Sequence, residues 1–220
     1  MAAILWDQVS ERVYETGVDH GVLYLPNASG VYTTGFAWNG LVSVSENPSG
    51  AEATPQYADN MKYLNLVSAE EFGATLEAFT YPAEFAVCDG TASPVAGLYV
   101  AQQARRAFGL HYRTLIGNDT EGTDYGYKLH LIYGALAAPT EKGYTTVNDT
   151  PEAITFSWEL TTTPVAVPGH KPTAALTIDS TEVGLTELAA LEAILYGDET
   201  LQPRLPLPAE VIDILTPAGP

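Results

Sequence analysis

The clearest strand pattern in the chain is Thr155-Phe-Ser-Trp-Glu-Leu-Thr-Thr-Thr163. Apolar and polar side chains alternate strictly from Phe156 to Thr161. This alternation turns one face of a strand toward a core and the other toward water, as in an antiparallel sheet. We therefore expect a half-buried antiparallel strand here.

A second pattern joins two alternating segments, Leu110–Ile116 and Tyr127–Tyr133, through a connector at 117–126 that is rich in Gly, Asn and Asp. Such turn formers between two strands predict a hairpin with a long loop. His111 and His130 fall on these paired strands and could meet across the hairpin. Two imidazoles are too few for a zinc site, so we interpret both as polar-face residues.

The remaining patterned segments favour strands over helices. Further strands are expected at 21–25, 31–45, 74–80, 98–102 and 174–179. Short helices are expected at 81–88, 186–196 and 209–215, the second capped by Thr186, stopped by Gly197 and packed by its leucines on the outer face of the sheet. The sequence thus predicts a mainly β fold, an antiparallel β-sandwich or barrel, in a single domain spanning 1–220.

Two segments fit this domain poorly and are interpreted as a loop and an arm. Residues 47–60 have no periodicity and are too long for an ordinary connection, so a long loop is expected. Residues 198–220 are a proline-rich C-terminal arm. The C-terminal arm ends in an amphipathic turn, which suits a neighbouring chain, with docking on its own domain as the alternative.

Composition excludes several classes of function. The chain has 220 residues, of which 46% are hydrophobic, and a net charge of −18. An acidic surface repels phosphate backbones, so conventional DNA or RNA binding is excluded. With Cys88 as its one cysteine the chain has no internal disulfide, and neither a signal peptide nor an apolar run that spans a bilayer is visible. We expect a soluble protein made in a cytoplasm.

No pattern for catalysis stands out. P-loop, dinucleotide-binding, nucleophile-elbow and zinc motifs are absent from the sequence. Asp119, Glu121 and Asp124 have the spacing of a calcium loop but lack its full pattern, so we interpret them as a solvated turn. We therefore expect no catalytic residue, no metal and no cofactor.

Four groups of residues resemble, in order and spacing, the major tail protein (tail tube protein) of long non-contractile-tailed phages, the siphophages, of Gram-positive, actinobacterial hosts. The likeness extends over nearly the whole chain. The groups are Leu5–Asp7 with Tyr14–Asp19; Trp38–Leu41 with Pro48–Glu52 and Tyr57–Asn60; Tyr81–Phe85 with Cys88–Gly90; and Leu191–Gly197 with Arg204–Pro208.

The resemblance implies a structural virion protein. Its copies would close into rings, usually of six, that stack into a tube for genome delivery, and segment 47–60 resembles the family loop that contacts the next ring. The resemblance also implies that residues 1–16 are an N-terminal arm that, like the C-terminal arm, joins neighbouring subunits. Implied partners are the chain itself, the tape measure protein, the tail terminator and the distal tail proteins, with no membrane. Expected subunit contacts are Trp6, Pro48, Gly50, Tyr57, Leu205, Leu207, Val211, Ile212 and Leu215.

The acidity has a function within this interpretation, because an acidic bore lets DNA pass without binding. We hypothesise that part of the excess faces the lumen, with Asp119, Glu121 and Asp124 as candidates. Two other classes remain open. The 13 tyrosines and 3 tryptophans suit a carbohydrate-binding β-sandwich module, and the many carboxylates allow a hydrolase with a carboxylate pair.

Overall fold

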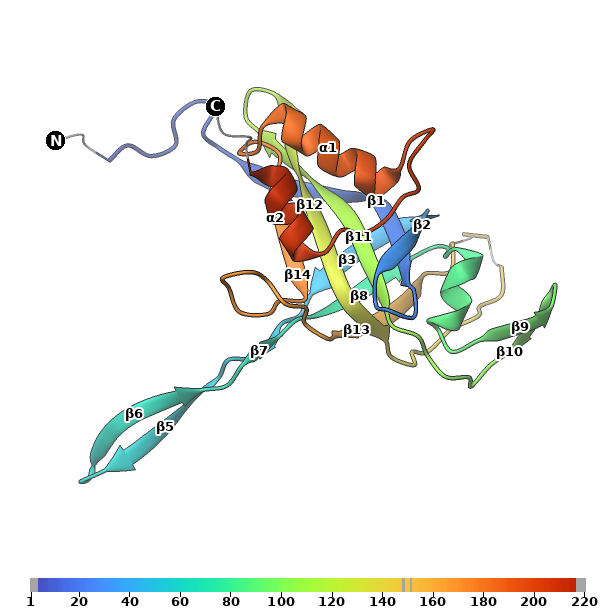
Figure 1. The fold of residues 1–220 in the computed structure, drawn as a ribbon, viewed down its shortest axis with the longest axis horizontal. Helices are drawn as coiled ribbons and strands as arrows, with labels where there is room; N and C mark the ends of the chain where they lie inside the picture. The colour runs from blue at the N-terminus through green and yellow to red at the C-terminus, as the bar shows by residue number, and fades with distance from the viewer. Residues whose placement is uncertain (1–3, 148, 151, 217–220) are drawn as a thin grey trace.

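The computed structural model describes residues 4–147, 149–150 and 152–216 and has the mainly β fold that the sequence predicts (Figure 1). The strands are β1 (Tyr14–Pro26), β2 (Tyr32–Trp38), β3 (Leu41–Glu46), β4 (Ser49–Gly50), β5 (Ala53–Ala58), β6 (Met61–Val67), β7 (Glu70–Glu71), β8 (Gly73–Ala78), β9 (Ala92–Val95), β10 (Leu98–Val100), β11 (Phe108–Asn118), β12 (Gly122–Ala137), β13 (Phe156–Thr162) and β14 (Ala175–Asp179). The helices are the 3-10 helix η1 (Ala83–Val87), α1 (Leu185–Tyr196) and α2 (Pro208–Leu215).

One antiparallel sheet organises the molecule, with strand order β2-β1-β11-β12-β13-β8-β3. Strand β12 forks: its residues Lys128–Ile132 pair with β14, and Ala135–Ala137 pair with β13. Gly134 lies at the fork with a φ of 57°, and a Cβ there would lie 2.5 Å from the carbonyl oxygen of Thr163. Glycine allows both this backbone conformation and the close approach of the two branches.

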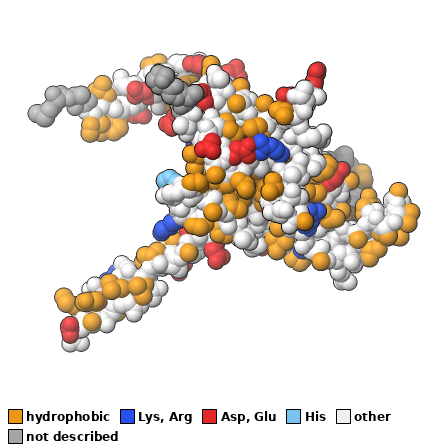
Figure 2. Space-filling model, viewed as in Figure 1, with side chains coloured by type: hydrophobic (Ala, Val, Ile, Leu, Met, Phe, Trp, Pro, Cys, Tyr) orange, Lys and Arg blue, Asp and Glu red, His pale blue; other side chains and the backbone are white. Residues whose placement is uncertain are grey.

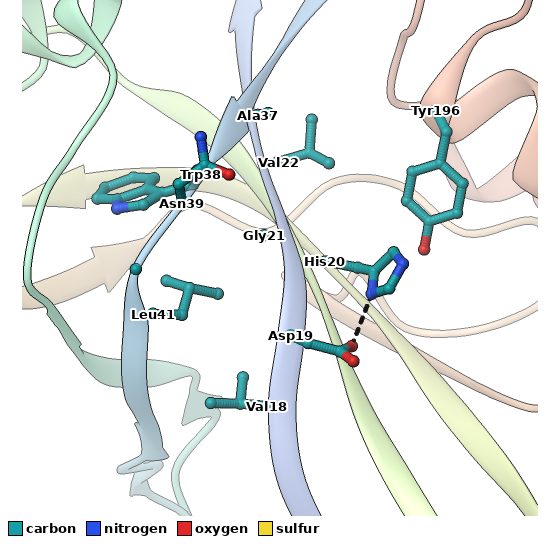
Figure 3. A pocket seen from close by; sticks show the side chains of 11 residues that line it. Val18, Asp19, His20, Gly21, Val22, Ala37, Trp38, Asn39, Leu41 and Tyr196 are labelled. Carbon is teal, nitrogen blue, oxygen red and sulfur yellow. Dashed lines mark ion pairs between the residues drawn. The ribbon is translucent and has the colours of Figure 1, made fainter. Parts of the chain in front are cut away.

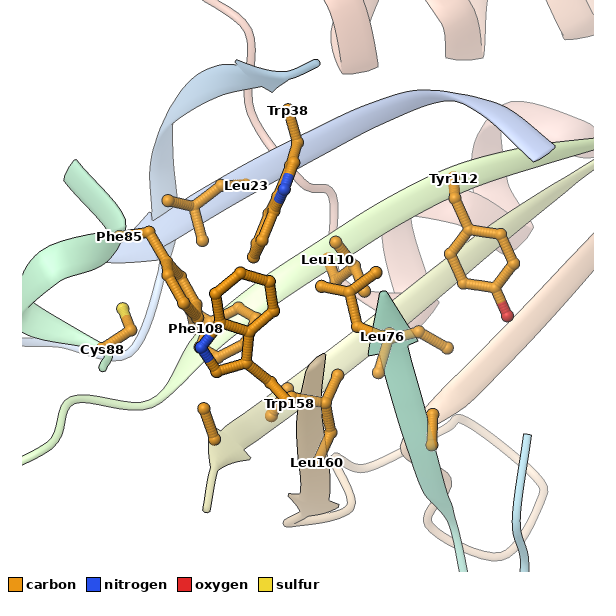
Figure 4. Packing of buried hydrophobic residues seen from close by; sticks show 14 of the residues in the cluster. Leu23, Trp38, Leu76, Phe85, Cys88, Phe108, Leu110, Tyr112, Trp158 and Leu160 are labelled. Carbon is orange, nitrogen blue, oxygen red and sulfur yellow. The ribbon is translucent and has the colours of Figure 1, made fainter. Parts of the chain in front are cut away.

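The first hydrophobic core lies inside the curl of the sheet (Figure 4). Trp158 of β13 packs edge-on against Phe85 of η1 with ring centroids 5.2 Å apart, and Trp38 of β2 lies 4.6 Å from Phe85. Strands near both ends of the strand order contribute to this core, because Leu76 of β8 and Leu23 of β1 belong to the same cluster. The sheet is therefore strongly curved around one aromatic centre.

The second core lies between the other face of the sheet and the two α-helices. Leu188, Leu191 and Leu195 of α1 are buried there together with Leu129 and Leu131 of β12. This confirms the prediction that the apolar stripe of 186–196 packs on the sheet. The predicted cap is wrong, since α1 begins after Gly184 and Thr186 lies inside the helix without a capping hydrogen bond.

The C-terminal segment packs on its own domain, which corrects the expectation that it reaches for a neighbouring chain. Leu205 is 1% exposed and forms a bridge to Tyr32 of β2, and Val211 of α2 is 3% exposed. Arg204 and Glu210 form an ion pair that ties the start of this segment to α2. The predicted helix at 209–215 exists, but its buried side belongs to the second core.

Three expected boundaries are also corrected. The segment 31–45 is two strands, because the chain turns at Gly40 with a φ of 74°. The connector 117–126 is a short turn, since β11 and β12 extend until Asn118 pairs with Gly122. The segment 81–88 contains a 3-10 helix instead of two α-helical turns.

The two leucines Leu191 and Leu185 of α1 give a direct test of the second core. Replacing Leu191, which is fully buried, by Ala should lower the free energy of unfolding by about 2–5 kcal/mol, because a cavity remains. Leu185→Ala is the control: Leu185 is 84% exposed, and the expected change is within about 0.5 kcal/mol. Urea unfolding monitored by tryptophan fluorescence measures both, and equal losses would contradict the packing described.

Candidate assembly surfaces

The largest exposed feature is an arm made of β5 and β6, which extends away from the body of the molecule (Figure 1). The strands are joined by Asp59 and Asn60, with φ angles of 51° and 61°. Two successive positive φ angles are typical of the type I′ hairpin turn, which Asn and Asp tolerate. Every residue from 51 to 70 is exposed. The arm therefore has strands but no core of its own.

The arm carries apolar side chains along its length (Figure 2). Tyr57 is 71% exposed, Tyr63 70% and Val67 62%, with Met61 and Leu66 similarly exposed. An isolated two-stranded hairpin is marginally stable in water, and burial of its apolar side chains against another surface would stabilise it. The exposed apolar side chains of the arm are therefore suited to packing against another protein surface.

Three of the expected subunit contacts lie on this arm or at its root. Pro48 is exposed just before β4, Gly50 of β4 pairs with Glu70 of β7, and Tyr57 is on β5. The expected long loop at 47–60 is thus wrong in its secondary structure. Sequence reasoning missed β6, although the turn-forming pair Asp59-Asn60 before Met61–Val67 is a hairpin signal.

The N-terminal arm is a second exposed apolar segment and leads away from the sheet (Figure 1). Trp6 is 74% exposed, as is Ile4. The base of the arm is held by Asp119, whose Oδ1 accepts a hydrogen bond from the Ser10 amide at 2.9 Å and whose Oδ2 lies 3.8 Å from Arg12 Nη1. Asp119 therefore positions the arm.

The other predicted contacts and acids are spread over the molecule. Leu207 and Ile212 are 38% and 40% exposed on the C-terminal segment, while Leu215 is half-buried. Glu121 lies in the β11–β12 turn, and Asp124 is exposed on β12. Within the described ranges, no three His, Cys, Asp or Glu side chains gather into a group that could hold a metal ion.

A groove of about 500 Å³ lies beside β1, the turn between β2 and β3, and the end of α1 (Figure 3). Asp19 is its principal charged group. Arg113 Nε and Nη2 each donate a hydrogen bond of 2.8 Å to the carboxylate, and His20 Nδ1 lies 2.9 Å from Asp19 Oδ1. The hydrogen bonds from Arg113 hold the pKa of Asp19 below its usual value. Asp19 is thus a stable ion-pair partner and a poor proton acceptor.

Beneath this groove His111 is fully buried between the sheet and α1. Its Nδ1 lies 2.9 Å from the carbonyl oxygen of His130, and its Nε2 lies 2.9 Å from the Tyr196 hydroxyl. A carbonyl only accepts, so Nδ1 carries the proton and Nε2 accepts from Tyr196. Burial lowers the pKa of His111 to about 3. The imidazole is a neutral link between β11, β12 and α1.

The side chains of His111 and His130 do not meet. His130 stacks on Tyr112 with ring centroids 4.6 Å apart, on the face opposite His111. The register explains this, because Tyr112 is the residue directly opposite His130, and one step along a strand reverses the side-chain direction.

Comparisons with known proteins find remote structural likeness only. No protein-family model matches it, and neither does any curated protein. A chain in the cryo-EM structure of the anti-feeding prophage (AFP) baseplate, 6-fold symmetrised, is similar with a TM-score of 0.35 and 11% identity, covering 80% of this chain and 97% of that chain. No helix in the described part of the chain is long and apolar enough to cross a membrane.

The buried His111 predicts how stability depends on pH. The folded chain binds this proton only near pH 3, whereas an unfolded histidine binds it near pH 6.5. The unfolded state therefore holds more protons between these values, and the free energy of unfolding falls as the pH drops through this window, by at most about 1.4 kcal/mol per pH unit for one group.

We expect His111→Gln to make the fall between about pH 6.5 and about pH 5 shallower than in the wild type. The control is His170→Gln, which removes an exposed histidine and should keep the wild-type slope. Urea unfolding at a series of pH values measures both. A variant whose slope matches the wild type would contradict the assignment of a neutral buried imidazole.

Proposed function

We propose that this chain is a structural virion protein, the tail tube protein of a siphophage, whose copies join into stacked rings of six, the usual number in the family that it resembles. The observation that carries the proposal is the β5–β6 arm, an apolar hairpin whose residues are all exposed. The sequence resemblance to major tail proteins points to the same role, because segment 47–60 falls on this arm. The proposed location is the phage tail, after synthesis in the host cytoplasm.

Sheet edges support the same proposal. Strands β2 and β3 end the strand order, and β14 branches from β12. Among the described residues each of these strands borders the sheet on one side, although β2 is partly covered there by the bridge between Tyr32 and Leu205. Open edges promote uncontrolled aggregation unless something covers them, and pairing between identical copies in a closed ring covers them. We infer that neighbouring copies supply the missing strands.

The net charge suits a conduit. Six copies in a ring carry six times the charge of −18 per chain. If part of this negative charge lies on the inner wall, the wall makes few favourable contacts with the phosphates of duplex DNA. DNA then slides through without specific binding. The tape measure protein would occupy the same bore before ejection, and the tail terminator and distal tail proteins would close the two ends of the tube. Glu121 and Asp124 remain the lumen candidates with free access to solvent.

Assembly through the arm is tested by placing a charge on its apolar surface. Leu66→Asp should reduce the fraction of chain that sediments as rings or tubes by about tenfold, because it adds one carboxylate to a surface buried on association. Asn65→Asp is the matched control: it adds the same charge at the neighbouring position and replaces a side chain that is already polar.

Both variants should keep the wild-type melting temperature as monomers, since residues 51–70 are exposed and lie outside both cores. Sedimentation and negative-stain microscopy provide the measurement. A carbohydrate-binding module would instead stay monomeric in the wild type. If Leu66→Asp assembled as well as the wild type, the β5–β6 arm would not be an assembly surface.

Passage of DNA without binding gives a further expectation. Assembled wild-type tubes mixed with short duplex DNA at low salt should retain none of it, because a net charge of −18 per chain repels the phosphates. Co-sedimentation of labelled DNA measures retention. Tight binding that weakens steeply as salt is added would contradict an acidic bore.

A further inference from the structure

A second apolar hairpin, β9–β10, projects from the body on a different side from the β5–β6 arm (Figures 1 and 2). Val95 is 66% exposed, Leu98 53% and Tyr99 63%. Leu98 pairs with Val95 across the hairpin, so these two side chains lie on the same side of it. Its tip turns at Gly97, with a φ of 83°.

The root of this hairpin is fixed to the first core. The Thr91 amide donates to the carbonyl oxygen of Ala86 at 2.8 Å, and the Gln103 amide donates to that of Gly90 at 2.9 Å. Both attachments adjoin η1, whose Phe85 is fully buried against Trp158. The hairpin is thus presented from a rigid base, which reduces the entropy lost when it binds.

The charge on and around the hairpin differs from that of the rest of the protein. No charged residue occurs between Asp89 and Arg105, although the chain as a whole carries −18. At the root, Arg105 and Lys142 both pair with the carboxylate of Asp89, and Arg106 donates to the carbonyl oxygen of Pro26. Three of the nine basic residues therefore gather beside an uncharged, apolar projection.

We propose that the β9–β10 hairpin is a docking surface for a second copy of this chain. Two copies with −18 each repel one another over most of their surfaces, and repulsion is weakest at an uncharged projection whose root pairs Arg105 and Lys142 with Asp89. A second copy can therefore approach this hairpin with less repulsion than it meets elsewhere. This inference rests on the proposed function and adds a specific contact to it.

The two hairpins lie on different sides of one copy, so each can contact a separate neighbour. A contact between β9–β10 and a different surface of the neighbour would be head-to-tail. Such head-to-tail contacts generate rings when the rotation closes and filaments when it does not. The β9–β10 surface therefore contributes to propagation of the assembly, separately from the β5–β6 arm.

The first test introduces a charge at the hairpin. Leu98→Glu should reduce sedimentable assembly by about tenfold while the circular dichroism spectrum and melting temperature of the monomer remain those of the wild type. The matched control is Leu185→Glu, the same substitution at a leucine that is 84% exposed at the start of α1. This control should assemble as the wild type does.

The second test uses cysteine labelling and does not depend on disrupting assembly. Cys88 is buried, so the folded wild-type chain provides the blank for a maleimide–polyethylene glycol reagent. In Tyr99→Cys the new thiol should react in the monomer and be at least about tenfold slower in the pelleted assembly. In Leu185→Cys the thiol should react at similar rates in both states.

The outcomes separate this inference from the function on which it rests. If the wild type assembles and Leu98→Glu assembles equally well, or the thiol at position 99 stays reactive in the assembly, the β9–β10 contact is wrong and the proposed function stands. If the wild type remains monomeric in every condition, both are wrong. Loss of assembly in Leu98→Glu together with protection at position 99 supports the contact.

Discussion

The forked strand β12 is the constraint on which the rest of the structure depends. One branch pairs with β13 and brings Trp158 into the aromatic core, and the other pairs with β14 beneath the helices. Gly134 allows β12 to pair with both strands, because a side chain at this position would clash with the backbone of Thr163. Two cores on opposite faces of one curved sheet follow from this junction. Both cores are completed within a single copy, including the C-terminal segment, which adds Leu205 and Val211 to the second one.

Because both cores are filled by side chains of the same copy, the exposed apolar segments do not pack within the domain. The N-terminal arm, the β5–β6 arm and the β9–β10 hairpin all present large hydrophobic side chains to solvent. A protein with so few bases keeps apart from its own copies by charge unless specific surfaces overcome the repulsion. Under the proposed function, apolar projections with few carboxylates serve this purpose. The acidity that would limit contact with DNA would then also restrict association to a small number of defined surfaces.

The sequence allowed the body to be predicted better than the projections. Alternation identified β11, β12 and β13, and helical spacing identified α1 and α2, because each buries one face and the pattern records it. The β5–β6 arm buries neither face and contains Pro55, so no alternation marks it. The sequence of the C-terminal segment reveals its apolar side but not which chain covers that side. The polar-face interpretation of His111 and His130 is wrong, because both side chains are buried, and a one-residue difference in register keeps them from meeting.

Under the proposed function, surfaces left open in one copy are covered by other copies. Hydrogen–deuterium exchange of backbone amides, followed by mass spectrometry on the monomer and on the pelleted assembly, tests this most directly. Peptides from 53–67 should exchange rapidly in the monomer and much more slowly in the assembly, while peptides from 185–196 in α1 should exchange at similar rates in both. Equal exchange of 53–67 in the two states, or the absence of any assembly to compare, would contradict the account.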